Sequence, residues 1–232
     1  MTGHALLMLP GNMCDARLWH GLGDRGAAHA DLSHDDSIAN MAARALADHQ
    51  GPLILIGFSM GGIVALEMAR RAPQRIKGLV LADTNAGADL PARAAARPIQ
   101  QARARSGELA IIVADELKPA YLATQNRDNG PLKTLLFDMA MALGEDVFVR
   151  QSEALRTRAD LAPVLNAFDG PVLFLCGAED ALCPPAWHHE MAARCRDAEL
   201  HVIEGAGHLL PLEQPTKFRA AIDGWLSRKF GE

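Results

Sequence analysis

Residues 53 to 62 of this chain are Leu53-Ile54-Leu55-Ile56-Gly57-Phe58-Ser59-Met60-Gly61-Gly62. The four leading apolar residues predict a buried strand, and a helical pattern follows directly over residues 63–69. Between strand and helix lies Gly-x-Ser-x-Gly, which in this context is the signature of a nucleophile elbow. Its sharp turn strains the central residue and lifts the Ser59 hydroxyl clear of the sheet, while Gly57 and Gly61 leave room for the crowded backbone. We therefore predict a nucleophilic Ser59; the alternative is an ordinary serine in a glycine-rich turn.

The composition is that of a globular protein of one domain with an insertion. The chain has 232 residues, of which 49% are hydrophobic, and a formal net charge of −5. It has no long basic run, which argues against nucleic acid as a partner, and no apolar run of membrane-spanning length. A monomer and a homodimer are both compatible with these features.

Cysteine usage and the first residues indicate the compartment. No signal peptide is recognisable, because the apolar residues 5–9 are too few and lack a charged leader. The cysteines show no metal-site spacing, so we interpret them as free thiols of a reducing compartment; they are Cys14, Cys176, Cys183 and Cys195. We expect a cytoplasmic protein.

Short apolar strands alternate with helical patterns along most of the chain. Such alternation predicts a doubly wound, mostly parallel α/β sheet of about six strands. The predicted strands are 5–9, 27–31, 53–58, 78–82, 172–176 and 199–203, and the predicted helices include 37–50, 60–71, 186–194 and 215–229.

Residues 85–168 interrupt this alternation. They carry few β signals and are rich in Ala, Arg, Leu and Met. We interpret them as a helical cap, or lid, inserted into a core formed by residues 1–84 and 169–232. At the carboxyl edge of a parallel sheet, such a cap would cover the crevice in which open α/β sheets bind ligands. We interpret its arginines as a solvated helix face.

A serine nucleophile needs a histidine that takes its proton. Of the nine histidines, His208 alone follows the last predicted strand in a loop of small residues, Gly205-Ala206-Gly207. These small residues let the loop turn back over the edge of the sheet. We therefore predict that His208 is the base that activates Ser59.

A carboxylate should orient this histidine and stabilise its cation. Asp180 is the best candidate, because it lies just past the strand at 172–176. Glu179 is adjacent, and Asp83 ends the neighbouring strand at 78–82, so both remain alternatives. The chain order Ser, Asp, His is the one expected of α/β hydrolases.

Acyl transfer creates an oxyanion that needs donors. One candidate is the backbone N–H of Met60, the residue after the nucleophile. The second candidate is the N–H of Asn12, since Gly11 gives the loop after the first strand room to curl inward. The alternative is an ordinary Pro-Gly turn.

With these motifs in place, the chain resembles the α/β-hydrolase superfamily over essentially its whole length. It is most similar to small bacterial carboxylesterases, such as the pimeloyl-carrier-protein methyl ester carboxylesterases. The motifs that carry the resemblance are Leu9-Pro10-Gly11-Asn12 with Trp19, residues 57–62, residues 79–83, Gly177-Ala178-Glu179-Asp180 with Pro184-Pro185, and Gly207-His208 with Pro211-Leu212-Glu213. As a set they are specific for the superfamily but weak on substrate.

The chain departs from its relatives at three places near the N-terminus, one of which is residues 20–31, a segment that is short for the helix and strand usually found there. Pro10-Gly11 stands where many relatives have His-Gly. Because the first predicted strand begins at residue 5, we expect a sheet of about six strands that lacks the usual N-terminal hairpin.

The resemblance implies a serine hydrolase that cleaves a small-molecule carboxylic ester through an acyl-enzyme on Ser59. Lactones and thioesters suit the same machinery, and the chemistry requires neither a metal nor an organic cofactor. Apolar residues near the predicted site would contact the substrate; these are Trp187, Leu209 and Tyr121.

Two other functions remain open. One is a carbon–carbon bond hydrolase acting on a β-diketone-like compound, which a basic group in the pocket would favour, for example Arg93, Arg97 or Arg127. The other is a ligand-binding sensor on a hydrolase scaffold, which lasting modification of Ser59 would support.

Overall fold

A computed structural model describes residues 4–23, 26–117 and 121–231. Its sheet has six parallel strands in the order β2-β1-β3-β4-β5-β6. This arrangement confirms the predicted fold class. The strands are β1 (Ala5–Leu9), β2 (Ala28–His29), β3 (Leu53–Phe58), β4 (Ile76–Ala82), β5 (Val172–Gly177) and β6 (Ala198–Ile203).

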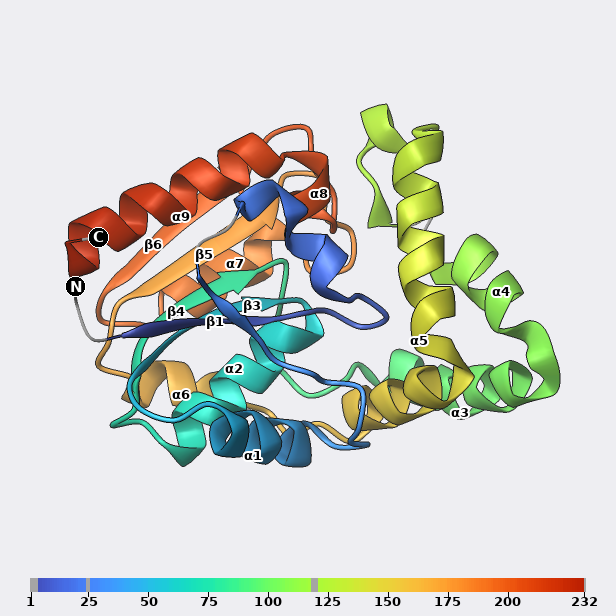
Figure 1. Cartoon of the computed structure of the whole chain (residues 1–232), viewed down its shortest axis with the longest axis horizontal. Helices are drawn as coiled ribbons and strands as arrows, with labels where there is room; N and C mark the ends of the chain where they lie inside the picture. The colour runs from blue at the N-terminus through green and yellow to red at the C-terminus, as the bar shows by residue number, and fades with distance from the viewer. Residues whose placement is uncertain (1–3, 24–25, 118–120, 232) are drawn as a thin grey trace.

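Helices cover both faces of the sheet and one end of it (Figure 1). The α-helices are α1 (Ile38–Asp48), α2 (Met60–Arg71), α3 (Pro91–Arg103), α4 (Leu109–Ile111), α5 (Gly130–Arg156), α6 (Ala162–Ala167), α7 (Pro185–Ala192), α8 (Leu210–Glu213) and α9 (Pro215–Phe230). Shorter helical segments of the 3-10 or π type are η1 (Ala16–Leu22), η2 (Ala104–Glu108), η3 (Ile112–Leu117) and η5 (Thr124–Asn126).

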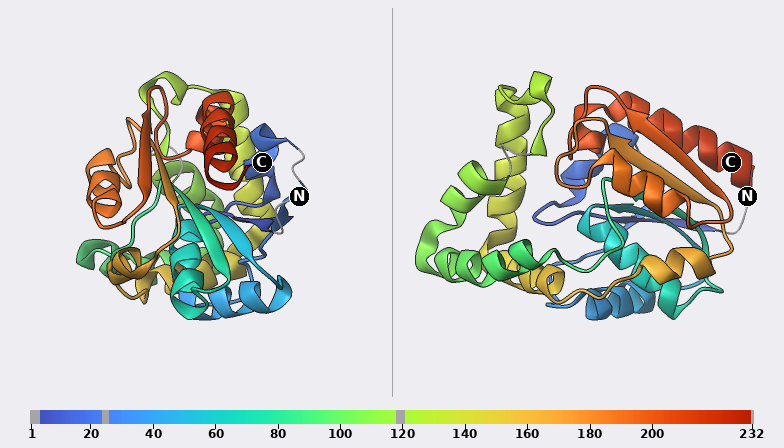
Figure 2. Two further views of the ribbon diagram at one scale, coloured as in Figure 1. Left: turned by 90° about the vertical axis from the view of Figure 1, so that its left-hand side faces the viewer. Right: turned by 180° about the vertical axis from the view of Figure 1, so that it is seen from behind.

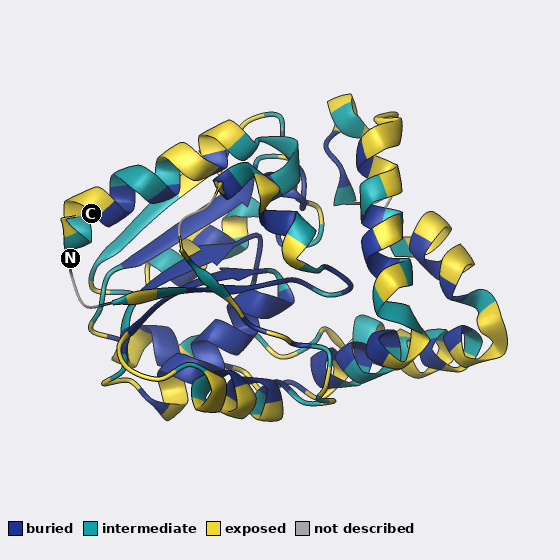
Figure 3. Cartoon of the chain, in the orientation of Figure 1, coloured by how far each residue is buried: buried dark blue, intermediate teal, exposed yellow. Residues whose placement is uncertain are grey.

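The alternation of side chains along the strands divides the core into two layers. Leu53 and Leu55 of β3 pack with α1, α2 and α7, whereas Ile54 and Ile56 pack with η1 and α9 on the opposite face. All six residues of β3 and of β5 are buried, as the near-continuous apolar sequence predicts for strands covered on both faces. Figure 2 shows α9 and α1 on opposite sides of the sheet, and Figure 3 shows the buried strands between them.

Helices α3, α4 and α5 lie beyond one end of the sheet, away from the two chain termini (Figures 1 and 2). Helices α4 and α5 share a third core cluster with η2 and η3, to which Met13 of the loop after β1 also belongs. Helix α5 is interrupted at Gly144, where φ is 81°. Helix α6 falls within 85–168 but packs against α2, and its Val164 and Leu165 belong to a core layer of the sheet.

Among the described residues, no helix is long and apolar enough to cross a membrane.

Candidate active site

Ser59 lies in a strained turn between β3 and α2. Its φ of 50° is unusual for a residue other than glycine. The flanking glycines have no space for a side chain, since a Cβ on Gly61 would lie 2.0 Å from the carbonyl oxygen of Leu9, and one on Gly57 would lie 2.6 Å from that of Gly61. The turn therefore has the backbone geometry that the Gly-x-Ser-x-Gly pattern predicts.

Three side chains from distant parts of the chain form a hydrogen-bonded row. Ser59 Oγ lies 3.0 Å from His208 Nε2, and His208 Nδ1 lies 2.9 Å from Asp180 Oδ2. Both His208 and Asp180 are 2% exposed. Neutral imidazole has one donor and one acceptor nitrogen, so with a proton on Nδ1 the Nε2 atom faces the serine hydroxyl as an acceptor.

The surroundings of Asp180 favour its ionised form. Burial opposes ionisation, but nearby His208 and the hydrogen bonds to the carboxylate outweigh it, so the pKa of Asp180 is lowered. The second oxygen accepts the backbone N–H groups of Leu182 at 2.8 Å and Cys183 at 2.9 Å. The carboxylate is thus held on both sides and cannot turn away from the imidazole without losing these bonds.

Asp83 occupies a different place from Asp180. Its two oxygens accept the backbone N–H groups of Gly177 at 3.0 Å and Leu210 at 3.1 Å. It therefore joins the loop that carries Asp180 to the loop that carries His208. Complete burial and the charge of Asp180 raise the pKa of Asp83 well above its ordinary value. The remaining alternative, Glu179, accepts hydrogen bonds from Thr124 instead.

The loop of His208 is held by contacts on three sides. Glu213 Oε1 accepts the backbone N–H groups of Gly207 at 2.8 Å and Leu209 at 3.2 Å. The N–H of His208 donates to the carbonyl of Tyr121 at 2.6 Å, and the Tyr121 ring meets the imidazole edge-on at a centroid distance of 5.2 Å. These contacts restrict the imidazole to one orientation.

A cavity of about 310 Å³ lies beside the Ser59 hydroxyl. Its walls come from the segments after β1, β3, β4, β5 and β6 and from the region between β4 and β5, so it sits at the carboxyl edge of the sheet. Asn12, Met60, Leu209 and Tyr121 line it, and Trp187 does not. The neighbouring His188 is completely buried and holds α7 against the sheet, which leaves Trp187 outside the cavity.

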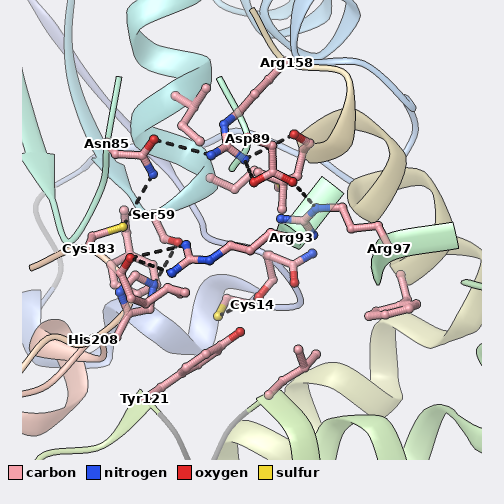
Figure 4. Close-up of a pocket in the computed structure, with 18 of the residues that line it drawn as sticks. Cys14, Ser59, Asn85, Asp89, Arg93, Arg97, Tyr121, Arg158, Cys183 and His208 are labelled. Carbon is pink, nitrogen blue, oxygen red and sulfur yellow. Dashed lines mark hydrogen bonds and ion pairs between the residues drawn. The ribbon is translucent and has the colours of Figure 1, made fainter. Parts of the chain in front are cut away.

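Arginines of the segment 85–168 also line the cavity (Figure 4). Arg97 Nε and Arg158 Nη1 donate to the two oxygens of Asp89, at 2.7 Å and 2.9 Å. Arg93 and Arg97 are partly buried there, which corrects the interpretation of the insertion arginines as a solvated face. Arg127 is not among the lining residues.

Sequence reasoning missed His188, which braces the back of the elbow. Thr84 donates its N–H to His188 Nε2 at 3.2 Å and its hydroxyl to the carbonyl of Ser59 at 2.7 Å. Burial lowers the pKa of His188 to about 4, so the ring is neutral at pH 7 and its Nε2 accepts. The position of this histidine within a helix carried no signal of its role.

Sequence reasoning also missed Gln151 of α5, which contacts the loop of Asn12. A sequence signal existed, because Gln151 lies one turn from Phe148 and from Leu155 on the buried stripe of the helix. A polar residue at a core position of that kind needs buried hydrogen-bond partners.

Cys183 brings its thiol close to Asp180 and His208, and the donor atoms of the three lie within 4.8 Å of one another. Burial raises the pKa of Cys183, whereas metals bind the thiolate. Asp180 and His208 are already bonded to each other. The donor chemistry therefore suits a hydrogen-bonded row better than a metal centre. None of the four cysteines, all of which lie in the described residues, forms a disulfide.

Comparisons with known proteins agree with this fold. Pimeloyl-acyl-carrier-protein methyl ester esterase of Neisseria meningitidis is 30% identical over 200 residues, which cover 84% of this chain and 77% of that protein. The enzyme of the same name from Cronobacter sakazakii is 30% identical over 204 residues, covering 85% and 76%.

The solved structures include close matches. An esterase from Thermogutta terrifontis, determined with malate bound, superposes with a TM-score of 0.89 at 28% identity, covering 98% of this chain and 90% of that one. The sequence model of the alpha/beta hydrolase family matches residues 6–221. The fold of this chain, its nucleophile elbow and the match to the family model show that the chain belongs to the alpha/beta hydrolase family.

Proposed function

We propose that this protein hydrolyses a small carboxylic ester, or a lactone or thioester, through an acyl-enzyme on Ser59. The observation that carries the proposal is the row Ser59–His208–Asp180, with its hydroxyl end at the cavity. Relatives at 30% identity named as methyl ester esterases support the reaction class. The cytoplasm remains the expected location.

In the first half of the reaction, Ser59 Oγ forms a bond to the acyl carbon while its proton passes to His208 Nε2. Asp180 stabilises the resulting imidazolium. The backbone N–H groups of Met60 and Asn12 hold the oxyanion; Met60 opens α2, so its N–H has no acceptor within the helix. His208 then protonates the leaving alcohol as the carbon–oxygen bond breaks.

In the second half, water replaces the alcohol. His208 takes a proton from this water, whose oxygen attacks the acyl carbon. The carboxylic acid leaves as the Ser59 oxygen recovers its proton from His208. The same groups therefore serve both halves, and the bond to Ser59 is broken at the end of each cycle.

Several residues of the segment 85–168 line the cavity, as the residues of a cap would. We propose that residues 85–168 act as this cap over the core, with Tyr121 and Leu209 in contact with the substrate. Burial raises the pKa of Tyr121 to about 12, so its phenol stays protonated and serves as a neutral wall.

The proposal is tested with p-nitrophenyl esters from acetate to decanoate. We expect turnover by the wild-type protein and its loss in Ser59→Ala with an unchanged circular dichroism spectrum. Burst kinetics would reveal the acyl-enzyme. Equal rates for the wild type and Ser59→Ala would overturn the assignment of Ser59.

A carbon–carbon bond hydrolase is the second candidate, favoured by the arginines in the cavity, because the ring-fission products that such enzymes cleave carry carboxylates. It predicts turnover of a β-diketone-like acid with no turnover of any ester. A folded protein that cleaves esters but not such an acid would exclude it.

A further inference from the structure

Arg93 places a guanidinium in the cavity without a carboxylate partner. Its two terminal nitrogens both donate to one neutral acceptor, the carbonyl oxygen of Leu182, each at 3.3 Å. Within residues 4–23, 26–117 and 121–231, no ion pair involves Arg93. Hydrogen bonds of this length lie beyond the usual range for N–H to oxygen, so the guanidinium is weakly satisfied.

In contrast to Arg93, the other two arginines of the cavity each have a carboxylate partner. Arg97 and Arg158 share Asp89, whose side chain is 1% exposed. One carboxylate thus faces two cations. The remaining acid of the lining, Glu116, is paired with Arg103, which does not line the cavity. The region around Arg93 therefore carries an excess of positive charge.

The position of Arg93 on its helix makes this charge costly. It is the third residue of α3, in the first turn, where the helix dipole favours acidic side chains and opposes basic ones. It is also partly buried. A half-buried guanidinium that has no carboxylate partner among the described residues can bind an anion from elsewhere.

The guanidinium points toward the reacting groups. Figure 4 shows the Arg93 side chain extending across the cavity to the end where Ser59, Cys183 and His208 lie. Its acceptor, Leu182, donates its own N–H to Asp180. An anion bound by Arg93 would therefore sit in the same cavity as the bond attacked by Ser59.

We propose that Arg93 binds a carboxylate carried by the substrate, which makes the preferred substrate a small ester with a free carboxylate at its other end. Half-esters of short dicarboxylic acids have this chemistry. The inference rests on the proposed esterase function. A carboxylate offers two charged oxygens to the planar fork of the guanidinium and displaces the weaker bonds to Leu182. A cavity of about 310 Å³, at the small end of ligand sites, suits such a compound.

The test compares monomethyl glutarate with its primary amide, which has the same shape but no charge. The quantity measured is the ratio of kcat/KM for the acid to kcat/KM for the amide. We expect a ratio of about 10 to 100 in the wild type, as for one charged hydrogen-bonded pair, and a fall to about 1 in Arg93→Gln. Arg93→Lys keeps the charge but not the fork, so its ratio should lie between the two.

The matched control is Arg105→Gln, which removes an exposed arginine that does not line the cavity. Its acid-to-amide ratio should equal that of the wild type. If the acid-to-amide ratio fell equally in Arg105→Gln and Arg93→Gln, the overall positive potential of the region, and not Arg93, would select the acid. That result would overturn the proposal.

A binding measurement separates this inference from the esterase proposal. Calorimetric titration of Ser59→Ala with monomethyl glutarate and with its amide should show the same preference for the acid, and Ser59→Ala/Arg93→Gln should lose it. Absence of the preference overturns the role of Arg93 even if neutral esters are cleaved. Its presence in a protein that cleaves no ester supports Arg93 and overturns the reaction class instead.

Discussion

The side-chain oxygen of Gln151 accepts the backbone N–H of Met13 at 2.8 Å, which joins helix α5 to the loop that carries Asn12. The same oxygen accepts the side-chain amide of Asn12 at 3.1 Å, and the Gln151 amide donates to the carbonyl of Leu32 at 3.1 Å. Gln151 is 2% exposed and Met13 is fully buried with φ of 52°. The proposed oxyanion loop therefore depends on a residue of α5 for its strained conformation.

Replacing Gln151 by Met removes the hydrogen-bond acceptor and the donor of the side-chain amide but keeps a side chain of similar volume. We expect kcat to fall by about 10- to 100-fold with a smaller change in KM, because a displaced oxyanion donor weakens transition-state binding. The buried N–H of Met13 loses its acceptor, at a cost of about 1–3 kcal/mol in the free energy of unfolding. Steady-state kinetics and urea unfolding measure the two effects.

Two further variants separate positioning from stability. Gln151→Glu keeps an acceptor for Met13 and should recover part of kcat, while Gln74→Met at an exposed position should change neither quantity. If Gln151→Met lost stability with kcat intact, Gln151 would be structural and would not position the oxyanion loop.

The contrast between Asp180 and Asp83 predicts different losses on removal of each charge. Asp180→Asn should lower kcat by about 10⁴-fold, since the imidazole loses its orienting carboxylate. Asp83→Asn should cost about tenfold or less, because Asp83 bonds backbone N–H groups and its raised pKa already favours the neutral form. An equal or larger loss in Asp83→Asn would reverse the assignment of the two carboxylates.

His188 should make the folded state sensitive to acid. Its folded pKa of about 4 lies below the ordinary value of 6.5, so the unfolded chain takes up the proton first. The stability that neutral His188 provides is complete above pH 6.5 and is lost as the pH falls toward 4, by up to about 3 kcal/mol. Urea unfolding across this range measures the loss.

Asp and Glu side chains also titrate in this pH range, so the effect of His188 is isolated by comparing the stability of variants. In His188→Gln the side-chain oxygen still accepts the N–H of Thr84 but does not titrate, so the curve of stability against pH should be flatter than in the wild type. His189→Gln, which changes the exposed neighbour, should leave the wild-type curve unchanged. Parallel curves for wild type and His188→Gln would contradict the buried neutral histidine.

The close packing of the elbow predicts that a side chain at Gly61 would clash with its surroundings. A Cβ there would lie 2.0 Å from Leu9 O, so Gly61→Ala must move the backbone of β1 or α2. We expect a loss of about 3 kcal/mol or more in the free energy of unfolding. Gly130→Ala, where a Cβ meets nothing within 4 Å, should be neutral or slightly stabilising. Equal stability of the two variants would mean that the elbow is not close-packed.

Much of the fold was predictable because its signals are local. The strands at β3 and β5 follow from runs of apolar residues, and Ser37 caps α1 where the pattern of polar and apolar residues changes. Short α/β units in a right-handed parallel sheet have few possible arrangements. The positions of Ser59 and His208 follow from the same rules, since each lies in the segment that follows a strand.

The site also contains contacts that no local pattern specifies. Asp180 and Asp83 both follow strands, and their separate partners depend on how two loops pack against each other. Gln151 meets Met13 across 138 positions of sequence, and Arg93 enters the cavity while Trp187 stays outside it. Local patterns determined the sheet, the elbow and the candidate roles of Ser59 and His208. The choice of Asp180 and the contacts of residues 85–168 were decided by tertiary packing, because hydrogen bonds and charges between distant segments form only once the helices are placed.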